Sequence, residues 1–141
     1  MRNNRRKERG FTLIELLIVM VILGLLAAIV VPQYGKQAEK SKLKDAKIQI
    51  TLLETAIEVY KLEVGKFPTQ DQGLEALRVK PGGEEKWDGP YLKKKVPNDP
   101  WGNPYVYKFP GDHEDYDIIS YGADGNPGGE MDIASWKDIG E

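Results

Sequence analysis

The sequence predicts an α+β fold in which one long N-terminal helix, first membrane-spanning and then amphipathic, packs on a small antiparallel β-sheet. Three observations support this prediction. An apolar run over residues 11–31 is long enough to form a helix across a bilayer. Apolar side chains then recur every three or four positions as far as residue 64, which is typical of an amphipathic helix. Residues 105–109 and 117–121 alternate in the manner of β-strands, with a turn between them.

The N-terminal segment has the layout of a membrane anchor. Residues 1–10 hold five Lys or Arg and one Glu, and the only charged residue of the apolar run is Glu15. A basic flank before a span holds the N-terminus in the cytoplasm, so residues 33–141 are expected on the other side. A secretory signal shares this layout. However, the run is longer than a signal core, and no polar cleavage region follows Ala28.

Glu15 is unusual because a carboxylate inside a membrane span is costly and normally needs a partner. Two interpretations are open: Glu15 stays hydrated near the interface, or it pairs with a cation. The span offers no cation, but a cut between Gly10 and Phe11 would create an α-amine that is charged near neutral pH. Phe11 and Glu15 are separated by four residues and share one helix face. The amine of a neighbouring subunit could therefore neutralise Glu15 in a medium of low dielectric constant.

The amphipathic part of the helix should pack against the globular domain through one apolar stripe, formed by Ala46, Ile50, Leu53, Ile57, Tyr60 and Val64. Gly65 is expected to end the helix. Pro32 removes a backbone donor and marks either the membrane exit or a weak point in the helix. Thr69 and Gln72 form a predicted capping box, followed by a short helix that buries Leu74 and Leu77.

Composition excludes several classes of function. The chain has 141 residues and a formal net charge of −2, and loss of the basic residues 1–10 would make it more acidic, so nothing indicates nucleic-acid binding. There is no cysteine, so neither a disulfide nor a thiolate metal site can form. The single histidine, His113, lies in a predicted turn and is expected to be solvated. No catalytic constellation or phosphate loop is present, so the chain is predicted not to be an enzyme.

The C-terminal loop from Tyr121 to Trp136 is the candidate metal site. It combines four glycines with Asp124, Glu130 and Asp132. Oxygen ligands without Cys or His favour Ca²⁺ over zinc. The spacing is not that of an EF-hand, and a solvated acidic loop is the alternative. A small domain without disulfides often needs another staple, which makes a bound ion a reasonable expectation.

The segment Gly10-Phe11-Thr12-Leu13-Ile14-Glu15-Leu16 resembles the class III signal of type IV pilins and type II secretion pseudopilins. That resemblance implies a prepilin peptidase that cuts after Gly10 and methylates Phe11, and a role for Glu15 in docking subunits. Segments farther along the chain are similar to those of major pseudopilins of type II secretion, namely residues 66–69, 72–77, 87–92, 99–105 and 120–125. Type IV pilins lack these segments, and many close the C-terminal region with a disulfide.

The resemblance implies a pilin-like fold divided into a leader peptide (1–10), a transmembrane and assembly helix (11–32) and a periplasmic globular domain (33–141). The implied function is a structural subunit of the periplasmic pseudopilus, a filament that drives export of folded proteins across the outer membrane. A type IV pilin of a surface fibre is the alternative, and a membrane-anchored enzyme or a plain single-pass anchor are more distant rivals. The implied partners are further copies in a helical homopolymer, minor pseudopilins, the prepilin peptidase and the inner-membrane assembly platform.

The same resemblance implies Ca²⁺ in the C-terminal loop. Asp124 and Asp132 would supply carboxylates, and the backbone carbonyls of Tyr121, Asn126 and Gly129 would complete the ligand set. The chain departs from the family at Met131, where many relatives carry an acidic residue. A thioether is no ligand for a hard ion, so one acidic contribution is missing here or is supplied by Glu130.

Overall fold

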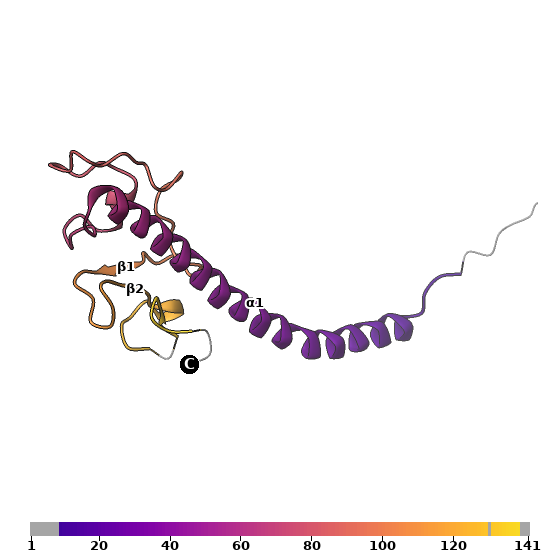
Figure 1. The fold of residues 1–141 in the computed structure, drawn as a ribbon. Coiled ribbons are helices and arrows are strands. Elements are labelled where there is room, and N and C mark those ends of the chain that lie inside the picture. Colours follow the sequence, from indigo (N-terminus) through magenta and orange to yellow (C-terminus); the bar gives the residue numbers. More distant parts are fainter. Residues whose placement is uncertain (1–8, 130, 139–141) are drawn as a thin grey trace, which may run out of the picture. The chain divides into compact units, whose positions relative to one another are not determined.

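The computed structural model describes residues 9–129 and 131–138 and consists of two compact units, Met1–Ala38 and Glu39–Glu141. A single helix, α1 (Leu13–Val64), runs through both units (Figure 1). Among the described residues, α1 is the helix long and apolar enough to cross a membrane, judged by length and composition. The C-terminal unit adds two short 3-10 helices and three strands: η1 (Leu74–Leu77), β1 (Val106–Lys108), β2 (Asp117–Ser120), η2 (Gly122–Asp124) and β3 (Ile133–Ala134).

In the N-terminal unit, α1 begins with a capping box that the sequence analysis did not include. The Thr12 amide donates to Glu15 Oε2 at 2.9 Å, and the Glu15 amide donates to Thr12 Oγ1 at 3.2 Å. This reciprocal pair satisfies two amides at the helix start, so the helix begins at Leu13. Pro32 lies inside α1 and does not interrupt it. The predicted division of the chain between a transmembrane helix (11–32) and a globular domain (33–141) stays a prediction, because the helix continues through this point.

The C-terminal part of α1 buries the predicted stripe. All six stripe residues belong to the hydrophobic core. Three other apolar side chains in this part of the helix are exposed, namely those of Ile48, Leu52 and Val59. The helix ends as predicted at Gly65, whose φ of 89° suits a residue without a side chain and whose amide reaches the Lys61 carbonyl at 2.8 Å.

The segment after α1 packs back onto the helix. The predicted capping box is present, with the Thr69 amide 2.9 Å from Gln72 Oε1 and the Gln72 amide 3.3 Å from Thr69 Oγ1. The short helix that follows is the 3-10 helix η1, which buries Leu74 and Leu77 as predicted. The chain that follows η1 is held to it by Trp87 Nε1, which donates to the Ala76 carbonyl at 2.8 Å.

The three strands form one antiparallel sheet in the order β1-β2-β3. The predicted hairpin is confirmed, with Tyr107 opposite Ile118. Strand β3 was not predicted, because two residues are too few to show an alternating pattern. It pairs Ile133 with Ser120 and so returns the end of the C-terminal loop to the strand from which the loop departs.

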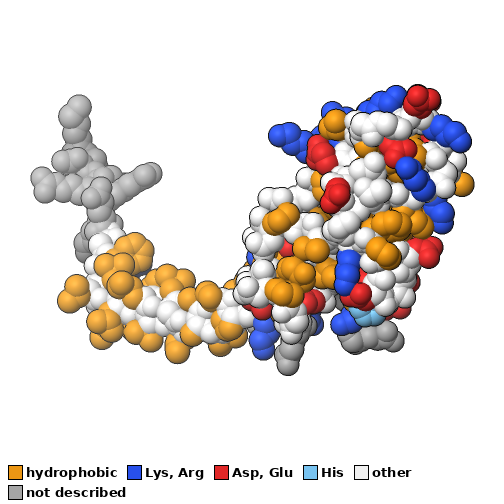
Figure 2. Space-filling model, turned by 90° about the vertical axis from the view of Figure 1, so that its left-hand side faces the viewer, with side chains coloured by type: hydrophobic (Ala, Val, Ile, Leu, Met, Phe, Trp, Pro, Cys, Tyr) orange, Lys and Arg blue, Asp and Glu red, His pale blue; other side chains and the backbone are white. Residues whose placement is uncertain are grey.

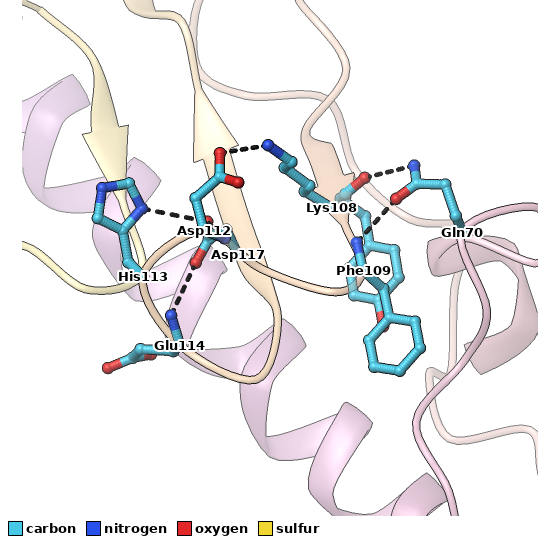
Figure 3. A network of polar contacts seen from close by, with 8 residues as sticks. Gln70, Lys108, Phe109, Asp112, His113, Glu114 and Asp117 are labelled. Carbon is cyan, nitrogen blue, oxygen red and sulfur yellow. Dashed lines mark hydrogen bonds and ion pairs between the residues drawn. The ribbon is translucent and has the colours of Figure 1, made fainter.

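The turn between β1 and β2 is organised by Asp117, which is 1% exposed (Figure 3). Its carboxylate accepts the amides of Asp112 at 2.7 Å and Glu114 at 3.3 Å. His113 is exposed and lies in this turn, as predicted, but it also makes two contacts that the sequence did not predict. Its ring stacks on Trp136 with centroids 3.8 Å apart, and its Nδ1 lies 3.2 Å from Asp117 Oδ2. Sequence neighbours alone could not reveal a contact with Trp136, which is 23 positions away.

Candidate functional site

The predicted processing bond, between Gly10 and Phe11, lies just before α1. Neither residue belongs to a helix or strand, and the Phe11 side chain is 83% exposed. Residues 1–8 of the predicted leader lie outside the described residues. A bond in exposed, non-helical backbone is one that a peptidase can take into an extended binding cleft. The geometry therefore suits the predicted cut, and removal of residues 1–10 would leave the Thr12–Glu15 capping box intact.

The apolar part of α1 presents hydrophobic side chains all around its surface. The large hydrophobic residues between Leu13 and Val31 are all at least partly exposed, and Figure 2 shows them covering this segment. A helix that is hydrophobic on every side is a buried core helix or a membrane span. Among the described residues of its own unit nothing covers it, so this surface is open to contact with lipid or with other protein chains.

Within the described residues, no cation lies within ion-pair distance of Glu15. The carboxylate uses Oε2 for the Thr12 amide, which is a local role at the helix start. This contact adds a third explanation for Glu15 to the two proposed from sequence. It does not supply the missing positive charge, so the predicted pairing with a subunit's α-amine stays a prediction.

The candidate metal site is the part of the C-terminal loop between β2 and β3, residues 121–132, hereafter the metal loop. The two ends of this loop touch at Gly122, where a Cβ atom built on the backbone would lie 2.6 Å from the Met131 carbonyl oxygen. Gly122 also has a φ of 64°, so a side chain there would be strained as well as obstructed. The loop is therefore closed by direct backbone contact, one residue before Asp132.

Closure of the loop brings Asp124 and Asp132 to the same point. A Cβ atom built on Gly129 would lie 2.8 Å from Asp124 Oδ2 and 3.5 Å from Asp132 Oδ1. Asp132 Oδ2 accepts the Gly128 amide at 2.8 Å, whereas Asp132 Oδ1 is buried without a hydrogen-bond partner among the described residues. A buried carboxylate oxygen without a partner is costly, and a hard cation would satisfy it.

The other predicted ligands lie along the same loop. Tyr121 precedes η2, and Asn126 is held against Asp124, because its amide reaches Asp124 Oδ1 at 3.1 Å and its Nδ2 reaches the Asp124 carbonyl at 2.9 Å. No group of three or more His, Cys, Asp or Glu in residues 9–129 and 131–138 is placed to share a metal ion. A site here would thus depend on two carboxylates with backbone oxygens. Glu130, the suggested substitute ligand, lies outside the described residues.

Two sets of contacts around this loop were missed by the sequence analysis. Lys47 Nζ donates to the carbonyls of Ala134, Ser135 and Lys137 at 3.0, 2.9 and 2.5 Å. Nothing in a charged helix surface distinguishes such a lysine from a solvated one. The second set joins the loop 98–104 to the start of the metal loop through the buried Asp99. The signal for it was the dense Asp-Pro-Trp-Gly-Asn-Pro turn at 99–104, whose role sequence could not specify.

An exposed apolar helix behind a processing motif, continued by an amphipathic helix packed on a small antiparallel sheet, defines a pilin-like subunit. Comparisons with known proteins narrow this class. The family model described as "Type II secretion system (T2SS), protein G" matches residues 33–136, and the "Prokaryotic N-terminal methylation motif" matches residues 5–31. The chain belongs to the type II secretion system protein G family.

Curated relatives match along nearly the whole chain. The type II secretion system core protein G of Pseudomonas aeruginosa is 46% identical over 138 residues, covering 94% of this chain and 97% of the relative. The core protein G of Vibrio cholerae is 47% identical, covering 94% of both chains. Among solved structures, the major pseudopilin from the type 2 secretion system of enterohaemorrhagic Escherichia coli matches with a TM-score of 0.64 and 34% identity. That match covers 76% of this chain and 96% of the solved one.

Proposed function

We propose that this chain is the precursor of a major pseudopilin, the repeating subunit of the periplasmic pseudopilus of type II secretion. The observation that supports this most strongly is the exposed apolar helix segment, which lies within the methylation motif matched over residues 5–31. The match to protein G relatives over 94% of the chain favours this role over a type IV pilin of a surface fibre. The filament would drive export of folded proteins across the outer membrane.

Assembly follows from the chemistry of the N-terminus. A prepilin peptidase removes residues 1–10 and methylates Phe11, leaving an α-amine four residues before Glu15. The apolar part of α1 waits in the inner membrane, with the N-terminus cytoplasmic and the globular domain periplasmic. Transfer from lipid into the filament keeps its surface in apolar surroundings, so the move costs little. Pairing of Glu15 with a neighbour's amine then favours one register over others, since an unpaired carboxylate there is costly.

Calcium is the proposed staple of the C-terminal loop. Asp124 and Asp132 would hold the ion, together with backbone carbonyls of Tyr121, Asn126 and Gly129. The unpartnered buried oxygen of Asp132 and its convergence with Asp124 near Gly129 support this assignment. Bound Ca²⁺ would supply two positive charges that hold the carboxylates together in a domain without disulfides. The chain's role is structural, and its further partners are minor pseudopilins and the inner-membrane assembly platform.

Complementation of a deletion strain tests the proposed function. Wild-type protein should restore export of the host's type II substrates to the medium, and a Gly10 variant that blocks the cut should not. Thr55→Ala, which removes one exposed hydroxyl from the solvent side of α1, is the control and should restore export. Restored surface adhesion or motility with export unchanged would instead indicate a type IV pilin.

A further inference from the structure

A buried carboxylate joins the loop 98–104 to the strand that leads into the metal loop. Asp99 is 4% exposed, and its Oδ1 accepts the amides of Trp101 at 3.1 Å and Asn103 at 2.8 Å. Its other oxygen, Oδ2, accepts the hydroxyl of Ser120 at 2.6 Å. A buried carboxylate with several good donors is well satisfied and is held in one orientation. Asp99 is therefore a fixed point for Ser120.

Ser120 links Asp99 to Gly122, the first residue of the 3-10 helix η2 in the metal loop. It is the last residue of β2 and is fully buried. While its hydroxyl donates to Asp99, its Oγ accepts the Gly122 amide at 3.2 Å. One hydroxyl thus connects the two loops. The three residues that it joins, Asp99, Ser120 and Gly122, are all buried.

Asn103 holds the same 3-10 helix from a second direction. Its Nδ2 donates to the Gly122 carbonyl at 3.0 Å. A Cβ atom built on Gly125 would lie 3.3 Å from that nitrogen, so the side chain also lies against the end of η2. Asp124 sits between these two contact points. Its backbone is therefore positioned by Asn103, although in the described part of the chain Asn103 forms no hydrogen bond with the Asp124 carboxylate.

Gly122 is also the point where the loop closes on itself. Its backbone lies against Met131, which directly precedes Asp132. A shift of Gly122 would consequently move both candidate carboxylates, Asp124 through η2 and Asp132 through Met131. The positions of the two side chains that could hold an ion thus both depend on Gly122, which Ser120 and Asn103 keep in place.

We propose that Asp99, Asn103 and Ser120 are positioning residues for the calcium site, and that the loop 98–104 acts as the template on which the metal loop is arranged before the ion binds. This inference rests on the calcium site of the proposed function. None of the three residues is a ligand. They act by fixing the backbone at Gly122. The loop is then already ordered when the protein has folded, so the entropic cost of ordering it does not reduce the affinity for the ion. Partners that orient ligands typically affect metal affinity by ~10- to 100-fold.

The rival explanation is that this network only stabilises the fold. A residue with a purely structural role changes the free energy of unfolding equally with and without Ca²⁺, so its replacement leaves the Ca²⁺ affinity unchanged. Measurement of that affinity therefore separates the two explanations. Tyr107→Phe provides the matched control. It removes a buried hydroxyl on β1 that donates to the Pro68 carbonyl at 2.8 Å and takes no part in the hydrogen bonds of Asp99, Asn103 and Ser120.

The experiment is calcium titration by calorimetry on the full-length protein in detergent micelles, for wild type, Ser120→Ala, Asn103→Ala and Tyr107→Phe. We expect Ca²⁺ to bind ~10- to 100-fold more weakly to both Ser120→Ala and Asn103→Ala, and normally to Tyr107→Phe. A second readout uses protein in chelator. Amide hydrogen exchange at residues 122–126 should be faster in Ser120→Ala and Asn103→Ala, and unchanged in Tyr107→Phe.

Wild-type affinity in both Ser120→Ala and Asn103→Ala would overturn the inference while leaving the calcium site intact. A wild-type protein that binds no Ca²⁺ would overturn the calcium site and the inference together, which is a different result. If Ser120→Ala fails to fold, Asn103→Ala decides, since Asn103 is only partly buried. An equal loss of affinity in Tyr107→Phe would also count against the proposal, because the effect would then be general destabilisation.

Discussion

The Thr12 amide and the Glu15 carboxylate are joined by a hydrogen bond of 2.9 Å, and the Glu15 amide returns a bond to the Thr12 hydroxyl at 3.2 Å. The carboxylate that the sequence places in an apolar span therefore starts the helix as well as carrying a charge. Both residues remain after a cut at Gly10. The capping role needs only an acceptor oxygen, whereas pairing with a subunit's amine needs a negative charge.

Substitution of Glu15 by Gln separates these two roles. Glutamine retains the capping oxygen and removes the charge, so we expect Glu15→Gln to fold normally but to assemble poorly. Glu15→Ala should also assemble poorly. The control is Thr12→Ala, which keeps the charge and loses the hydroxyl cap. The measurement is the fraction of the protein recovered in filaments released from the periplasm. Normal assembly of Glu15→Gln, with a defect in Thr12→Ala, would show that capping is the important role.

Calcium should raise the thermal midpoint of the full-length protein in micelles. A ligand at 100 times its dissociation constant stabilises a protein by about 2.7 kcal/mol. Each kcal/mol moves the midpoint of a domain near 100 residues by roughly 4–8 °C, so we expect a rise of about ten degrees or more. Calorimetry with Ca²⁺ and with chelator measures it. Asp124→Ala should abolish the rise, while Asp112→Ala, an exposed carboxylate in the β1–β2 turn, should keep it. Identical wild-type melts would indicate that the loop with Met131 has lost its ion.

Asp117 should make the globular unit sensitive to acid. Burial raises the pKa of this carboxyl, but the amides of Asp112 and Glu114 and the contact with His113 outweigh it and lower the pKa overall. A lowered folded pKa gives stability that is present above the ordinary value of about 3.9 and is lost as pH falls further. We expect Asp117→Asn to cost about 1–3 kcal/mol at pH 7.

Denaturant unfolding across pH measures this effect. The difference between wild type and Asp117→Asn should begin to shrink below about pH 4, where the carboxyl of the unfolded chain becomes protonated, and should vanish once the pH falls below the lowered pKa of the folded state. Asp115→Asn, an exposed neighbour in the same turn, should behave as wild type at every pH. A difference that stays constant down to about pH 3 would mean that the charge of Asp117 is unimportant.

Lys47 should hold the end of the metal loop. Its ammonium group donates to the carbonyls of Ala134, Ser135 and Lys137, so Lys47→Met removes three hydrogen bonds to a charged donor. Hydrogen bonds to charged groups contribute about 1.5–3 kcal/mol, and we expect a loss of that order in the free energy of unfolding. Faster amide exchange over residues 133–137 should accompany it. Lys44→Met, on the exposed surface of the same helix, is the control. Equal effects of the two variants would contradict the proposal that Lys47 holds the end of the metal loop.

The sequence predicted those parts of the fold whose signal is local. The stripe from Ala46 to Val64 and the capping box at Thr69 depend on spacings of three and four residues, which can be read directly. The capping box of Thr12 and Glu15 is equally local but was not predicted, whereas the other missed contacts join residues that are distant in the sequence. Lys47 meets carbonyls 87 or more positions away, and Ser120 meets Asp99 across 21. No local periodicity records such contacts, so only the folded chain reveals what arranges the candidate calcium loop.

The N-terminus of the chain in native filaments tests the central claim most directly. Filaments released from the periplasm of a host that carries the complete secretion system would be purified and analysed by mass spectrometry. The proposed function predicts that the chain in them begins at Phe11, with a methyl group on its α-amine. Filaments containing chain that still begins at Met1, or a filament fraction without this protein while it remains uncut in the membrane, would contradict it.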